Sequence, residues 1–295
     1  MKLLSYEYEA CEALGILDNS GEGIIPLASL GIHYSEMNEL IQKASPQELA
    51  QLKTASQQKQ GELELGAVVK LAPIPVPLQD VICVGFNYID HVEESENFKN
   101  ITSGTPKEGR PEYPVYFSKR VFKAVPDDGK IISRPDLDLW LDYEIELGVV
   151  IGKDAKDVPQ DKAQEYIFGY TIINDISARM LQARHKQFYF GKSLDSSCPM
   201  GPWIVTQDEF PHPLNIELKL HVNGELRQKA NTKDMLFSIP RIISELSCAM
   251  TLRSGTIIST GTPSGVGAAT QSFLKKGDLV ECFIQGIGEL RNVVE

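Results

Sequence analysis

Three acidic residues in two short segments could form a metal site. Glu144 and Glu146 lie in residues 142–151, DYEIELGVVI, whose apolar and β-branched residues predict a strand. Side chains two apart on a strand project from the same face, about 7 Å apart along the backbone. A second apolar run, residues 170–179, supplies Asp175. Three such carboxylates would form an all-oxygen site for a hard divalent ion such as Mg²⁺ or Mn²⁺.

The strand that carries Glu144 and Glu146 is open to two interpretations. An acidic pair of this spacing is commonly the solvated face of an edge strand. However, Ile145 and Leu147 on the other face lead into the apolar run 149–151, which favours a buried central strand. Buried carboxylates must be paired or bound to a metal, so this context favours the metal site.

Residues 85–94, GFNYIDHVEE, follow a predicted strand and contain a candidate catalytic pair. His91 and Glu94 are three residues apart and share one face of a helix, so Glu94 can accept the imidazole proton. A histidine oriented by a carboxylate is suited to activating water near neutral pH. The alternative is a solvent-exposed start of a helix.

Other segments offer ligand-binding groups. The glycine-rich run 260–267, TGTPSGVG, lacks the phosphate-loop pattern and a following helix is not expected. Its backbone N–H groups and the Thr262 hydroxyl would suit a carboxylate, although a plain tight connection is equally compatible. Arg179 and Gln182 follow Asp175 and either project toward the same ligand or decorate the surface.

Composition excludes several classes of function. The chain of 295 residues has a net charge of −11 and no long Lys/Arg cluster, which argues against nucleic-acid and anionic-membrane surfaces. No apolar run could span a bilayer, and Glu7 and Glu9 interrupt any signal-like start. Five scattered cysteines without C-x-x-C spacing indicate reduced thiols in the cytoplasm, and Cys198 is expected to have a packing role.

The organisation of the chain changes at the proline-rich stretch 71–77, LAPIPVP, which cannot be helical. We therefore expect a small N-terminal α/β domain, residues 1–72, and a catalytic domain, residues 73–295. Ser45 and Pro46 indicate a helix start in the first. The second has many short β-rich runs and few helices, so it is β-dominated α+β, with a type I′ hairpin at Asn223-Gly224.

Residues 92–113 contain few apolar side chains and directly follow His91. A loop of this length in a compact domain is typical of an active-site lid or of a disordered segment, and its position after His91 favours a lid.

Five segments, in this order, resemble the fumarylacetoacetate hydrolase superfamily: residues 85–94, 142–147, 174–182, 191–202 and 260–267. The resemblance covers about residues 78–290. It implies a C-terminal mixed β-roll and a homodimer. The metal, Mg²⁺ or Mn²⁺ with Ca²⁺ as an alternative, would bind Glu144, Glu146 and Asp175. The resemblance also implies catalysis by His91, Glu94 and Lys192, and ligand contacts from Arg179, Gln182 and Thr262.

Two departures from the family pattern concern the far end of the substrate. Phe86 stands where some members carry an arginine before Asn-Tyr, a position that recognises a distal acidic group. The lid segment is also a few residues longer than in compact members.

The expected reaction is hydrolysis of a C–C bond in a small 2,4-dioxo acid of the acylpyruvate or fumarylacetoacetate type. The metal would bind the 1-carboxylate and 2-oxygen and stabilise an enolate. With the lid closed, the His91–Glu94 pair would deprotonate water for attack at C4, and the C3–C4 bond would break to release pyruvate enolate. Lys192, with a pKa lowered by the nearby cation, would return a proton.

The same site would also serve decarboxylation of oxaloacetate-type acids or isomerisation of unsaturated 2-oxo diacids, because neither needs attack by water. A non-catalytic alternative is a metal-stabilised binding or scaffold dimer. Three carboxylates leave coordination positions open, which favours catalysis.

Overall fold

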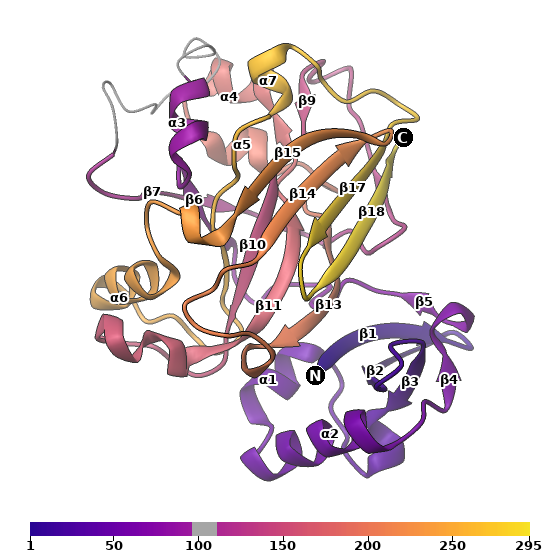
Figure 1. The fold of residues 1–295 in the computed structure, drawn as a ribbon. Helices are drawn as coiled ribbons and strands as arrows, with labels where there is room; N and C mark the ends of the chain where they lie inside the picture. The colour runs from indigo at the N-terminus through magenta and orange to yellow at the C-terminus, as the bar shows by residue number, and fades with distance from the viewer. Residues whose placement is uncertain (96–110) are drawn as a thin grey trace.

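A long mixed sheet runs through the computed structural model, which describes residues 1–95 and 111–295 (Figure 1). Its strand order is β4 (Leu63–Glu64), β3 (Gly23–Pro26), β2 (Cys11–Leu17), β1 (Lys2–Tyr8), β13 (Met200–Thr206), β11 (Ile167–Asn174), β10 (Ile145–Ile151), β16 (Ile257–Ser259), β6 (Val81–Gly85) and β7 (Val115–Lys119), with β5 (Val69–Lys70) paired to β1. Neighbouring strands are antiparallel except β16 and β6. β10 is therefore a central strand.

A second sheet packs against the middle of the first. Its order is β15 (Glu225–Asn231), β14 (Glu217–Val222), β17 (Leu279–Ile284), β18 (Gly288–Val294) and β8 (Lys130–Ile131). Leu220 and Ile284 from this sheet join Leu147 and Ile172 from the first in one buried apolar core. The β-dominated mixed fold expected from the sequence is confirmed, and it is not a doubly wound sheet.

The strand expected over residues 142–151 is interrupted at residues 143–144. It divides into β9 (Leu141–Asp142), which pairs with β12 (Ser177–Ala178), and β10. At the break, side-chain oxygens replace the backbone carbonyls that would accept hydrogen bonds within a sheet. Asp142 accepts the Tyr143 N–H and Asn174 accepts the Glu144 N–H. This break places Glu144 directly before β10.

Helices cover the ends of the sheets. They are α1 (Met37–Lys43), α2 (Pro46–Gln58), α3 (Ile89–Ser95), α4 (Arg179–His185), α5 (Phe188–Lys192), α6 (Ile239–Ala249) and α7 (Gly267–Thr270), with short 3₁₀ helices η1 (Leu27–Leu30), η2 (Leu65–Ala67), η4 (Gln160–Tyr166), η5 (Gln207–Glu209) and η6 (Thr232–Asp234). In Figure 1, α3, α4, α5 and α7 gather at the end of the molecule opposite the N-terminal strands.

Local sequence signals explain several of these elements. Ser45 caps α2 through a reciprocal capping box with Glu48, and Pro46 is its first residue. Asn223 and Gly224 both have positive φ, 52° and 78°, as a type I′ hairpin requires. The expectation of no helix after the glycine-rich run was wrong, because the short helix α7 begins at Gly267.

The N-terminal part is joined to the rest by backbone pairing. β1 pairs with β13, with Leu3 opposite Ile204, so the long sheet continues across the expected boundary at residue 72. The division into two domains stays a prediction. The expected lid lies largely in residues 96–110, outside the described residues. No helix within the described ranges has both the length and the apolar character needed to cross a bilayer.

Candidate active site

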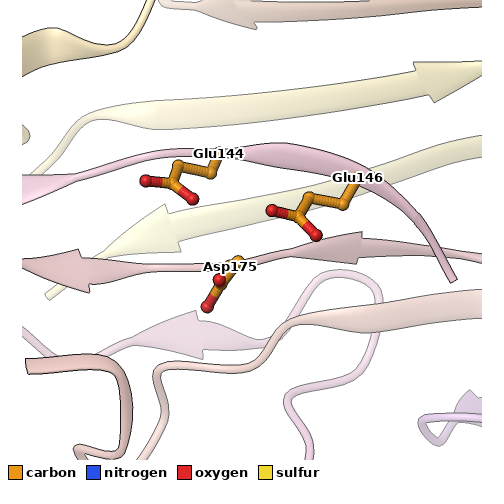
Figure 2. Close-up of side chains that lie close together, drawn as sticks. All are labelled: Glu144, Glu146 and Asp175. Carbon is orange, nitrogen blue, oxygen red and sulfur yellow. The ribbon is translucent and has the colours of Figure 1, made fainter. Parts of the chain in front are cut away.

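Glu144, Glu146 and Asp175 converge where strand β10 begins and strand β11 ends (Figure 2). Each offers a carboxylate oxygen, and these oxygens lie within 4.8 Å of one another. Antiparallel pairing of Ile145 with Asn174 brings the two strand ends together, and the Asp175 N–H donates to the Glu144 carbonyl across 2.8 Å. The three side chains are 5%, 2% and 0% exposed. The sequence therefore predicted both their burial and their proximity.

The three carboxylates have different electrostatic surroundings. Glu144 lies 2.6 Å from Lys192 Nζ and 2.6 Å from Arg179 Nη2. Although burial raises the pKa of Glu144, these two cations outweigh it and lower the pKa to about 2. Glu146 instead accepts hydrogen bonds from neutral groups, Ser259 Oγ at 2.6 Å and Gly261 N–H at 2.9 Å.

The pKa of Glu146 is raised well above its usual value by burial, by Asp175 and by Glu144. No lysine or arginine of the described residues forms an ion pair with it. A divalent cation between the carboxylates would favour the charged form of Glu146, and all donors are oxygens. The residues therefore fit a hard divalent metal ion.

Two buried lysines contact the acidic group. Lys192 Nζ lies 2.6 Å from both Glu144 and Asp175. Burial lowers the pKa of Lys192, but Asp175 and Glu144 raise it more. The lowering of this pKa by a bound cation stays a prediction. Sequence reasoning missed Lys119, at the end of β7, whose Nζ lies 2.8 Å from Asp175 Oδ1 and donates to the carbonyl of Ile176.

Arg179 and Gln182 lie on one face of α4. Arg179 donates to Asp142 at 2.9 Å, to Glu144 at 2.6 Å and to the side-chain oxygen Oε1 of Gln182 at 3.1 Å. Asp142, another residue that sequence reasoning missed, also accepts the N–H groups of Gly267 and Ala268. The buried Gln182 Nε2 has no hydrogen-bond partner among the described residues. It is therefore suited to donate to a bound ligand.

The structure brings His91 and Glu94 together on α3. His91 Nδ1 lies 2.8 Å from Glu94 Oε1, and the Glu94 carboxylate also accepts the Gly265 N–H at 2.9 Å. The His91 ring stacks on Phe86, with centroids 5.8 Å apart. The imidazole is buried, so the alternative of an exposed helix start does not hold.

The glycine-rich run binds carboxylates, as expected, but they belong to the protein. Gly261 holds Glu146 and Gly265 holds Glu94. Both glycines have positive φ, 98° and 101°, and a Cβ on Gly265 would lie 1.9 Å from the Arg227 carbonyl oxygen. Glycine is therefore required at Gly265 for the close approach of the two chain segments.

One pocket collects most of the predicted residues. Its lining includes His91, Glu144, Glu146, Arg179, Gln182, Lys192 and Thr262, together with Val84, Gly85, Phe86, Phe117 and Phe188. Glu94 and Asp175 lie behind this surface, in contact with His91 and Lys192. The pocket thus has a charged side and an aromatic side.

Comparison with known proteins identifies the family. Residues 80–295 match the family described as fumarylacetoacetate (FAA) hydrolase C-terminal. The chain belongs to this family. Oxaloacetate tautomerase YisK of Bacillus subtilis (strain 168) is 45% identical over 229 residues, which are 77% of this chain and 73% of that protein.

Two solved structures of the family are similar over the whole chain. Fumarylacetoacetate hydrolase (EaFAH) from the psychrophilic Exiguobacterium antarcticum has a TM-score of 0.80 and 35% identity, covering 100% of this chain and 99% of that one. Maleylpyruvate hydrolase from Sphingobium sp. SYK-6, in complex with manganese(II) and pyruvate, has a TM-score of 0.76 and 28% identity, covering 100% and 98%.

Proposed function

We propose that this protein is a divalent-metal-dependent enzyme that interconverts the enol and keto forms of a short 2-oxo diacid of the oxaloacetate type. The observation that carries the proposal is that His91, which Glu94 holds, lines the same pocket as Glu144 and Glu146 of the carboxylate group. The 45% identity to an oxaloacetate tautomerase supports this choice of reaction.

Glu144, Glu146 and Asp175 would hold the ion, Mg²⁺ or Mn²⁺. When bound, it would supply Lewis-acid stabilisation for negative charge on the 2-oxygen of the acid. Lys192 would add a fixed positive charge beside the same oxygen, and Gln182 Nε2 would donate to a carboxylate of the substrate. Arg179 is held by Asp142 and Glu144, so it would orient these groups as well as line the pocket.

His91 would move the proton at C3. Glu94 holds Nδ1, so Nε2 is the nitrogen assigned to this transfer. In ketonisation the 2-hydroxyl loses its proton and C3 gains one, and the two transfers reverse on enolisation. Thr262, fixed to the Ile145 carbonyl at 3.0 Å, lines the same pocket and would contact the substrate there.

A second candidate is hydrolytic C–C cleavage of a 2,4-dioxo acid. The aromatic side of the pocket, formed by Phe86, Phe117 and Phe188, favours it because these rings suit an apolar acyl group better than a second carboxylate. Here His91 would take a proton from water, which attacks the C4 carbonyl. The C3–C4 bond breaks, and its electrons leave with pyruvate as the enolate.

Product analysis distinguishes the two reactions. Enol-oxaloacetate, an acylpyruvate, fumarylacetoacetate and a hydroxymuconate-type diacid are incubated in D₂O with Mg²⁺ or with EDTA and followed by NMR. The proposal expects Mg²⁺-dependent ketonisation of enol-oxaloacetate with deuterium at C3 and an intact carbon chain. Cleavage of the acylpyruvate without enhanced ketonisation would establish the second candidate and exclude the first. The homodimer and the cytoplasmic location stay predictions.

A further inference from the structure

A side chain of the second sheet, Gln228, connects Ile145 of β10 with Thr262 and Pro263 of the glycine-rich run. Gln228 lies on β15, is 1% exposed and is absent from the lining of the pocket. Its Oε1 accepts the Ile145 N–H at 3.0 Å. Its Nε2 donates to Thr262 Oγ1 and to the Pro263 carbonyl, both at 2.8 Å. Both donors of the amide are therefore in use.

The first contact fixes Ile145, the first residue of β10, which lies between two of the carboxylate residues. Ile145 lies between Glu144 and Glu146, and both of its backbone polar groups are bound within this cluster. Gln228 accepts its N–H, and the Thr262 hydroxyl donates to its carbonyl at 3.0 Å. A shift of Ile145 would move the Glu144 and Glu146 carboxylates, because these are the residues directly before and after it in the chain.

The other two contacts fix the glycine-rich run. Thr262 and Pro263 lie between Gly261, which binds Glu146, and Gly265, which binds Glu94. Since Gln228 holds the middle of this run, it constrains both N–H groups. The Gln228 amide thus sets the position of Glu144 and Glu146 relative to Glu94, which orients His91.

We propose that Gln228 is a positioning residue, which aligns the metal-binding strand with the segment that orients the His91–Glu94 pair. The inference rests on the proposed metal site and reaction. Hydrogen-bonding partners behind metal ligands typically change metal affinity or activity about 10–100-fold when they are replaced. We expect Gln228 to fall within this range.

The test uses two variants and a matched control in the full-length protein. Q228L removes all three hydrogen bonds, whereas Q228E keeps an acceptor for the Ile145 N–H and loses both donors. The control is N292L on β18 of the same sheet, where the buried Asn292 also donates two hydrogen bonds, to the carbonyls of Pro126 and Gly129. Each protein is titrated with Mn²⁺ by calorimetry and assayed for kcat and KM, and its Tm is measured.

Q228L is expected to bind Mn²⁺ about 10–100-fold more weakly than the wild type and to lose a similar factor in kcat. Q228E should lose more in kcat than in Mn²⁺ affinity, because its contact with Ile145 survives. N292L should lower Tm and leave Mn²⁺ affinity within about twofold, as a side chain with a purely structural role would. If Q228L does not fold, the kcat and Mn²⁺ affinity of Q228E test the proposal.

Gln228 variants with wild-type Mn²⁺ affinity, and with a kcat no lower than that of N292L, would overturn this inference alone. A wild-type protein that binds no Mn²⁺ would overturn the proposed metal site and the inference with it.

Discussion

Lys119 Nζ lies 2.8 Å from Asp175 Oδ1, and both side chains are completely buried. The same ammonium group donates to the carbonyls of Ile176 and Lys192. Lys119 therefore contacts Oδ1 of Asp175 while Lys192 contacts Oδ2, and it satisfies two backbone acceptors. It neutralises part of the negative charge that folding gathers at this site.

Replacing Lys119 with methionine should destabilise the protein by about 3–5 kcal/mol, because one member of a buried ion pair is left without its partner. Denaturant unfolding in EDTA measures this loss. Mg²⁺ should restore more stability to K119M than to the wild type, since it replaces part of the missing charge. The control K43M removes the exposed pair with Glu39 and should cost less than about 1 kcal/mol. Equal losses in the two variants would contradict the prediction.

Glu146→Gln should abolish turnover and weaken Mg²⁺ or Mn²⁺ binding strongly, because one of three carboxylate ligands loses its charge. In EDTA, however, E146Q should be at least as stable as the wild type, since burial and two neighbouring carboxylates disfavour the charged form of Glu146. Unfolding curves and metal titrations on the same preparations test both parts. Wild-type turnover that is unchanged by EDTA would show that the metal assignment is wrong.

The carboxylate triad could be predicted because its signal is local. The two-residue spacing of Glu144 and Glu146 gives one strand face, and the apolar residues around them indicate a central strand. Asp175 follows the adjacent apolar run, and the antiparallel pairing of β10 with β11 then places it beside them. The three-residue spacing of His91 and Glu94 likewise predicted their contact.

Lys119, Asp142 and Gln228 could not be predicted because their roles depend on packing between distant segments. Gln228 reaches Ile145 across 83 positions of sequence, and Asp142 reaches Gly267 across 125. No local pattern distinguishes such a residue from a solvated one. The sequence pattern of strand β18 is weak for a related reason. A polar residue, Asn292, occupies its buried face and obscures the alternation of apolar residues.

His91→Ala should separate a reaction in which His91 transfers a proton to carbon from one whose bond-breaking step needs no such transfer. Ketonisation measured by deuterium incorporation at C3 should fall about 10²–10⁴-fold, as is typical when a general acid–base group is lost. Decarboxylation of oxaloacetate, measured by CO₂ release in the same sample, should fall less because CO₂ leaves before any proton is transferred to carbon. Equal losses in both would mean that His91 serves a step common to them, such as substrate binding.

Asp18→Asn should destabilise the N-terminal part of the fold at neutral pH but not at low pH. The hydrogen bond from the Ser20 hydroxyl outweighs partial burial and, with the N–H groups of Gly61, Gly23 and Gly21, lowers the pKa of Asp18. Because the folded pKa lies below the unfolded value of about 3.8, the stabilisation is fully present above that pH and is lost as the pH falls through the folded pKa. The loss at pH 7 should be about 1–2 kcal/mol.

Urea unfolding of D18N and the wild type at several pH values from 7 to 3 tests this prediction. The difference in the free energy of unfolding between the two proteins should stay constant down to about pH 4 and become smaller below it. Asp161→Asn, at an exposed position on η4, is the control and should show no gap at any pH. A D18N gap that persists unchanged at pH 3 would show that the asparagine disrupts the Asp18–Gly61 contact through its shape, and that the charge of Asp18 contributes nothing.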